Sequence, residues 1–105
     1  MDIDLNNSIY STYASLKIFR PQAIPGTLYL LNDCIYFKYR GFLEGHEIKN
    51  IFYFENIKSI RFGFSFSPFR IVITEKNGEN WIFDQVPKKN GREFVEKFDF
   101  INNYN

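Results

Sequence analysis

The sequence has very few of the residues on which catalytic and metal sites usually depend. Its 105 residues contain one cysteine, Cys34, and one histidine, His46. A nucleophile needs a base beside it, and a structural metal needs several ligands at workable spacing. No phosphate-binding glycine loop, nucleophile elbow or His-Glu zinc motif occurs in the chain. We therefore expect no enzyme, no metal and no cofactor.

Long apolar runs and a strong net charge are also missing. No segment approaches the ~18 uninterrupted apolar residues of a membrane-spanning helix, and residues 1–7 lack the basic and apolar regions of a signal peptide. Thirteen Lys and Arg against twelve Asp and Glu give a net charge of +1. So small a charge provides no strong field for nucleic acid or an anionic membrane. We expect a cytoplasmic protein that attaches to membranes at most peripherally, through a local patch.

Aromatic residues, in contrast, are abundant, with 13 Phe, 7 Tyr and one Trp. Such side chains suit the pleated surface of a sheet, so the composition favours a β protein. With 45% apolar residues, the chain can bury a core as one domain without disulfides. We expect a polar segment over residues 1–12, the domain over 13–101 and a polar tail over 102–105.

The single cysteine and histidine fit structural rather than chemical roles. Cys34 lies in the apolar run Cys-Ile-Tyr-Phe, where a reduced, buried thiol is expected. His46 follows a glycine in a polar stretch and is expected to be a solvated loop residue. Neither has the partners that a nucleophile or a general base requires.

The first half of the chain predicts strands joined by turns. Residues 13–19 alternate apolar and polar positions and predict a strand, followed by a rigid loop through Pro21 and Pro25. Residues 27–31 and 35–39 are apolar runs around Asn32-Asp33, which predicts a hairpin. A loop over 41–47 then leads into an apolar stretch over 48–54.

The second half alternates more sharply and ends in a helical pattern. Ile60, Phe62, Phe64 and Phe66 recur at period two, which indicates a strand with one covered face. After Pro68, strands are predicted over 69–76 and 79–85 around the Asn77-Gly78 turn.

The last stretch predicts one amphipathic helix over residues 92–101. Asn90 can cap this helix, and Glu93 three residues later completes a pair like a capping box. One stripe at helical spacing consists of Phe94, Val95, Phe98 and Ile101.

Several of these segments together resemble a known family. Residues 26–37 combine a glycine, a Leu-Tyr-Leu strand, an Asn-Asp turn and an apolar-Tyr-Phe strand, which resembles the opening of a GRAM domain. Residues 54–60 resemble its acidic-x-Ile-x-x-Ile segment, and residues 70–78 its strand and Asn-Gly turn. The resemblance covers residues 13–101. It implies a mainly β fold of the pleckstrin-homology-like type, a curved antiparallel barrel or sandwich capped by one C-terminal α-helix.

The same resemblance implies binding rather than catalysis, since the shared motifs are strand and turn positions. Relatives of this fold bind phosphoinositides or other membrane lipids, bind proteins, or self-assemble. Those that bind lipids usually carry basic residues near the first strand pairs. In this sequence Lys17, Arg20, Lys38 and Arg40 could take that part.

A second candidate surface surrounds an aromatic segment. Phe64, Phe66 and Phe69 stand between Arg61 and Arg70. If the strand ends before Phe64, these rings form a loop tip that inserts into a membrane or a partner. If the period-two pattern continues, Phe64 and Phe66 belong to the buried stripe. A separate basic cluster of Lys88, Lys89 and Arg92 fits a solvated surface.

The leading interpretation is therefore a non-enzymatic binding module for a membrane lipid head group or a protein partner. The alternative is a self-associating or protein-interaction scaffold that uses an exposed strand edge. A more distant one is single-stranded nucleic-acid binding, because residues 61–66 interleave Arg with Phe. The candidate binding residues are Lys17, Arg20, Lys38, Arg40, Arg61, Phe64, Phe66, Phe69 and Arg70.

Overall fold

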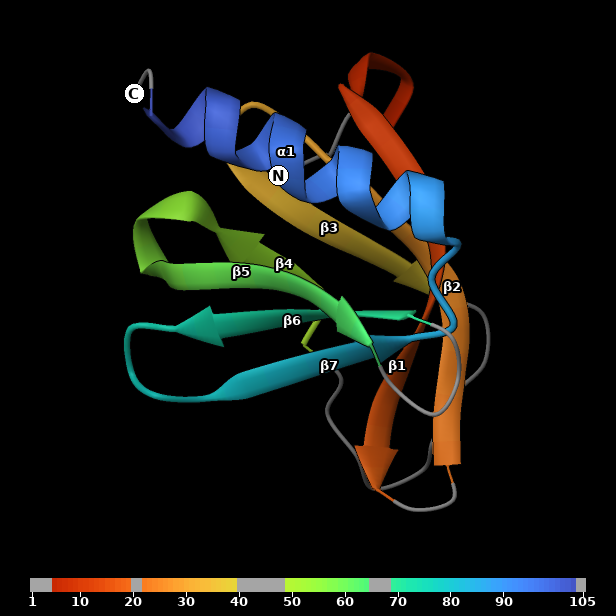
Figure 1. The fold of residues 1–105 in the computed structure, drawn as a ribbon. Helices are drawn as coiled ribbons and strands as arrows, with labels where there is room; N and C mark the ends of the chain where they lie inside the picture. Colours follow the sequence, from red (N-terminus) through yellow and green to blue (C-terminus); the bar gives the residue numbers. More distant parts are fainter. Residues whose placement is uncertain (1–4, 20–21, 40–48, 65–68, 104–105) are drawn as a thin grey trace.

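The computed structural model describes residues 5–19, 22–39, 49–64 and 69–103, without the side chains of residues 18, 19, 22 and 64. These residues form a sheet of strands and one long helix, together with two short 3-10 helices, η1 and η2 (Figure 1). In chain order the elements are η1 (Leu5–Asn7), β1 (Tyr10–Phe19), β2 (Gln22–Leu30), β3 (Cys34–Tyr39), β4 (Ile51–Tyr53), η2 (Phe54–Asn56), β5 (Ile57–Phe64), β6 (Phe69–Glu75), β7 (Asn80–Asp84) and α1 (Lys88–Asn103).

All seven strands belong to one antiparallel sheet with the order β4-β3-β2-β1-β7-β6-β5. Strand β1 links the two halves, because it pairs along its length with β2 and through residues 15–17 with β7. Among the described residues the sheet is not closed, since β4 and β5 stand at the two ends of the order. Figure 1 shows α1 lying across one end of the curved sheet.

The core lies on the concave face of the sheet and contains three phenylalanine rings, two of which pack edge to face against the third. Phe37 of β3 and Phe83 of β7 meet edge to face with centroids 5.1 Å apart. Phe52 of β4 contacts the same Phe83 ring at 6.0 Å. All three side chains are fully buried. Their contacts join the two halves of the sheet, and edge-to-face pairs add about 0.5–1.5 kcal/mol each beyond area burial.

Helix α1 covers the end of the core with the predicted stripe. Phe94 and Phe98 are buried, and Val95 and Ile101 pack against the core. Gly91 gives the helix room to approach the sheet, because a Cβ there would lie 2.4 Å from the Phe62 ring. Within the described ranges, no helix is long and apolar enough to cross a membrane.

The predicted cap of this helix is wrong. The helix begins at Lys88, so Asn90 lies inside its first turn, and the Gly91 amide already donates to the Pro87 carbonyl at 2.8 Å. Pro87 directly precedes the helix, where its missing N–H removes no intrahelical hydrogen bond. The Asn90 amide instead donates to the Tyr10 hydroxyl at 3.1 Å, which ties the helix to β1.

Strand β2 also differs from the prediction, because it runs through Pro25 rather than starting after it. Pro25 lies opposite Ser15 of β1, and among the described residues the pairing of β2 with β3 starts at Gly26. A strand tolerates a proline where its missing N–H is not needed for a hydrogen bond to a neighbouring strand. Gly26 itself is required for close packing, since a Cβ there would lie 2.8 Å from the Phe37 ring.

The predicted turns and the second-half strands are confirmed. Strands β2 and β3 are joined around Asn32-Asp33, and Gly78 adopts a positive φ of 95° between β6 and β7. Strand β4 is shorter than the apolar stretch 48–54 suggested, because the chain turns into η2 at Phe54. The loop expected over 41–47 lies outside the described residues.

Candidate functional site

The structure separates the candidate binding residues into several groups. Arg20, Arg40 and Phe66 lie outside the described residues, as does the side chain of Phe64. The backbone of Phe64 ends β5 opposite Phe69 of β6. The candidate side chains within the described part of the chain are those of Lys17, Lys38, Arg61, Phe69 and Arg70.

Lys17 and Arg61 lie at the two ends of one row of cross-strand neighbours on the outer face of the sheet. Across four adjacent strands, Lys17 lies opposite Ile82, Ile82 opposite Val72, and Val72 opposite Arg61. The adjacent row of these strands points to the core, with Leu16, Phe83 and Ile71 all buried. Because side chains alternate along strands, the Lys17 row points away from the core.

A carboxylate in the neighbouring row binds two of the cations. Asp84 accepts a hydrogen bond from Arg70 Nε at 3.0 Å on Oδ1, and Arg70 Nη2 lies 3.5 Å from Oδ2. Lys17 Nζ is 3.7 Å from the same Oδ2. Asp84 is 8% exposed, so this carboxylate holds the two cations at the surface of the sheet.

We call this surface the outer-face patch, formed by Lys17, Arg61, Arg70, Val72, Ile82 and Asp84. Val72 and Ile82 are half-exposed at its centre, and Arg61 is exposed at its edge. Three cations against one carboxylate leave the patch with positive charge. An apolar centre within a charged rim is the usual anatomy of a protein interface.

Lys38 lies apart from the outer-face patch, on the half of the sheet formed by β1, β2 and β3. It is opposite Thr27, which is opposite Tyr13. Lys38, Thr27, Tyr13 and Tyr29 line a shallow hollow of about 370 Å³. Tyr39 also lines this hollow, so one lysine and three tyrosines share its lining.

Phe69 packs against other parts of the fold. Its ring stacks on Phe62 with centroids 5.4 Å apart and an interplanar angle of 10°. The ammonium group of Lys88, in the first turn of α1, lies 5.8 Å from the centroid of the Phe69 ring. Phe69 is half-buried, and its carbonyl accepts a hydrogen bond from the Val86 amide at 3.2 Å. This ring therefore belongs to the junction between β5, β6 and the start of α1.

The cysteine is buried, as the sequence predicted, and its thiol is expected to be unreactive. Cys34 is 2% exposed, and burial raises the pKa of its thiol to about 11, with a further contribution from the Asp33 carboxylate. A neutral thiol is a poor nucleophile and a poor metal ligand. His46 lies outside the described residues. Within the part of the chain that is described, no group of three His, Cys, Asp or Glu side chains could hold a metal ion.

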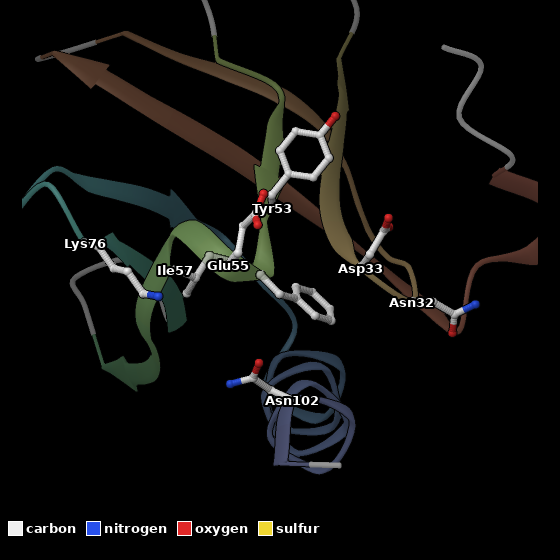
Figure 2. A pocket seen from close by; sticks show the side chains of 8 residues that line it. Asn32, Asp33, Tyr53, Glu55, Ile57, Lys76 and Asn102 are labelled. Carbon is white, nitrogen blue, oxygen red and sulfur yellow. The ribbon is translucent and has the colours of Figure 1, made fainter. Parts of the chain in front are cut away.

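A further hollow in the described part of the chain was not predicted from the sequence. Figure 2 shows it between the β2–β3 turn, the segment from β4 to β5, and the last turn of α1. Its volume is about 710 Å³. We call it the carboxylate hollow, and its lining residues are Asn32, Asp33, Tyr53, Phe54, Glu55, Ile57, Lys76 and Asn102. No linear motif could have identified it, because these residues come from four separate segments of the chain.

Comparison with known proteins identifies the fold. No family model and no curated protein matches the sequence. The structure is similar to the C-terminal domain of an unknown protein from Leishmania infantum, with a TM-score of 0.67, 8% identity, and coverage of 90% of this chain and 84% of that chain. It is also similar to the pleckstrin homology domain of USP37, with a TM-score of 0.62, 16% identity, and coverage of 90% and 98%.

Structural similarity at such low sequence identity establishes the architecture of the chain and leaves its function open. Membership of the GRAM branch in particular stays a prediction. The seven-stranded antiparallel sheet, the C-terminal helix across its end and the similarity to the USP37 domain together show that this chain has a pleckstrin-homology-like fold.

Proposed function

We propose that this domain is a non-catalytic binding module that recognises a protein partner through the outer-face patch. One observation favours a protein ligand: Asp84 binds Arg70 and Lys17 beside half-exposed Val72 and Ile82. An anionic lipid head group needs cations that are free to bind phosphate, and here one carboxylate already engages two of them. A protein partner can use the apolar centre and the remaining positive charge together.

The charge of the patch suggests the chemistry of the partner. Arg61 is exposed at one end of the row, and Lys17 is only partly neutralised at the other, 3.7 Å from Asp84. A segment with apolar residues flanked by Asp or Glu would match this distribution. Charges at the rim of an interface mainly increase the association rate and the specificity, while the buried apolar centre supplies affinity.

A membrane lipid head group is the second candidate ligand. Lys38 is exposed beside the hollow that contains Tyr13 and Tyr29, and no ion pair of Lys38 is found within the described part of the chain. A single lysine near an anionic surface contributes about 1 kcal/mol, so attachment would need further cations or apolar insertion. The cytoplasmic location and the absence of enzymatic activity expected from the sequence belong to the same proposal.

The test starts from peptides selected on the immobilised domain from a random display library. We expect the selected peptides to combine acidic and apolar residues. In the amide NMR spectrum they should shift the signals of Arg61, Val72 and Ile82. Arg61→Glu should weaken their binding about fivefold, because it replaces attraction by repulsion at the rim.

The matched control is Lys58→Glu, which makes the same charge change at an exposed position of the same strand. Equal weakening by both variants would mean that only net charge matters, and would reject the patch. Vesicles of mixed phosphatidylcholine and phosphatidylserine provide the second arm. Cosedimentation that Lys38→Glu abolishes and Arg61→Glu leaves unchanged would replace the protein-binding proposal by lipid binding.

A further inference from the structure

The carboxylate hollow is built from residues that take no part in the outer-face patch. Asn32 and Asp33 come from the β2–β3 turn, Glu55 from η2, Lys76 from the turn after β6, and Asn102 from the last turn of α1 (Figure 2). Its volume of about 710 Å³ exceeds what one side chain fills, so several residues of a ligand could enter. The hollow is therefore a second place at which a partner could bind.

The electrostatics of this hollow are opposite to those of the patch. Asp33 and Glu55 are exposed carboxylates, and Lys76 is the only cation among the described lining residues. Helix α1 ends beside them without a basic residue in its last turn. Because the C-terminal end of a helix carries partial negative charge, it adds to the negative potential there. A cationic ligand group would be favoured.

The aromatic ring of Phe54 in the lining favours a guanidinium group over an ammonium group as the cationic ligand. Phe54 is half-buried and held edge to face against Phe98, with centroids 4.9 Å apart, so its ring has a fixed position. A planar guanidinium group can pair with carboxylates in a bidentate manner and also stack on an aromatic ring. An ammonium group is a compact, strongly hydrated charge and gains less from such a surface.

We infer that the carboxylate hollow binds the arginine side chain of a protein partner. Asp33 and Glu55 supply the carboxylates, and Phe54 supplies the aromatic surface. The carboxamides of Asn32 and Asn102 can hydrogen-bond to the backbone of the residues that flank the arginine. A bound metal ion is a poorer fit, because no group of three potential metal-ligating side chains exists among the described residues. This site is independent of the outer-face patch and takes a ligand of opposite charge.

The probes are three blocked amino acids, titrated into the full chain and followed by the amide NMR signals of the protein. They are the Nα-acetyl methylamides of arginine, of lysine and of citrulline, which has the shape of arginine without its charge. We expect millimolar binding of the arginine compound, with the largest shifts at Asp33, Phe54 and Glu55. The lysine compound should bind more weakly, and citrulline should give little response. Equal responses to arginine and citrulline, or shifts confined to other residues, would overturn the inference.

Substitutions that remove single charges from the lining test whether the carboxylate hollow binds arginine. Glu55→Gln and Asp33→Asn should each weaken arginine binding about two- to fivefold, whereas Lys76→Gln should strengthen it, because exposed ion pairs contribute up to about 1 kcal/mol. The control is Glu79→Gln, which removes an exposed carboxylate outside the hollow. If Glu55→Gln and Glu79→Gln lower affinity equally, the hollow is not the site. The acidic peptides that test the outer-face patch should bind Glu55→Gln unchanged, so the two proposals can fail separately.

Discussion

Arg70 and Asp84 lie opposite each other on β6 and β7, and two guanidinium nitrogens approach the two carboxylate oxygens at 3.0 and 3.5 Å. The same carboxylate is 3.7 Å from Lys17 of β1. One buried acid therefore holds cations from both neighbouring strands. This arrangement stabilises the sheet and limits how much of the local positive charge is free for a ligand.

Removing the charge of Asp84 should destabilise the protein. In Asp84→Asn, Arg70 and Lys17 lose the negative charge that they share, and one carboxylate oxygen is replaced by an NH2 donor. We expect the free energy of unfolding to fall by about 1–2 kcal/mol, a value reduced by the partial exposure of both cations. Urea denaturation measures the change. Asp99→Asn on the exposed face of α1 is the control, and a similar loss there would contradict a specific role of Asp84.

Gly91→Ala should also destabilise the protein, although alanine is the better helix former. Helix propensity alone favours the substitution by about 1 kcal/mol. The new methyl group would lie 2.4 Å from Phe62 Cε1 and 3.0 Å from Val86 Cγ1, so α1 must move away from the sheet. We expect a net loss of about 1–2 kcal/mol in the free energy of unfolding. Adding Phe62→Leu should recover part of it, and a more stable Gly91→Ala protein would contradict the packing described.

The two phenylalanines near the end of α1 should differ in their importance. Phe98 is 3% exposed and contacts Phe54, whereas Phe100 is 65% exposed. Phe98→Ala should cost about 3–5 kcal/mol, enough to threaten folding of a small domain. Phe100→Ala should cost well under half of that. Thermal and urea unfolding of both variants would test whether the helix is part of the core, and equal effects would show that it is not.

The stability of the protein should fall at high pH partly because of Cys34. Burial raises the pKa of this thiol from 9.0 to about 11. A raised folded pKa gives a contribution to stability that is complete below pH 9 and is lost as the pH rises toward about 11. Tyrosine and lysine side chains titrate in the same window. The loss must therefore be compared with that of Cys34→Ala, which should be smaller, and identical losses would contradict the shifted pKa.

Much of the fold could be predicted because its signals are local. The Asn77-Gly78 turn, the period-two pattern around Ile60 and the helical stripe around Phe94 each depend on neighbours in the sequence. The start of α1 was misplaced because Asn90 has the right chemistry for a cap, and only the contact with the distant Tyr10 hydroxyl shows that its amide is used elsewhere. Pro25 was predicted to lie in a loop because proline disfavours strands, whereas its pairing with Ser15 of β1 continues β2 through it.

The candidate site depended more on long-range information. Lys17, Arg61 and Arg70 were predicted as binding residues, but the sequence assigned Lys17 and the two arginines to different surfaces. Lys17 joins their face through the placement of β1 beside β7, which no local pattern specifies. Asp84 was missed because a carboxylate at the end of a strand looks like an ordinary surface residue. The carboxylate hollow was not predicted, because its lining residues are distant in the sequence and meet only where the turns and the end of α1 come together.

The short pairing of β1 with β7 also determines at which stage of folding the outer-face patch is completed. The hairpin of β6 and β7 and that of β1 and β2 can each form from nearby residues, whereas Ser15 and Asp84 must meet across most of the chain. Contacts at such sequence separation are slow to form, because closing the long loop costs entropy before the contact is gained. Lys17 therefore joins Asp84 and Arg70 late. A partly folded chain that holds only β5, β6 and β7 would lack the Lys17 end of the outer-face patch, and a partner that contacts the whole patch would bind the finished domain more tightly.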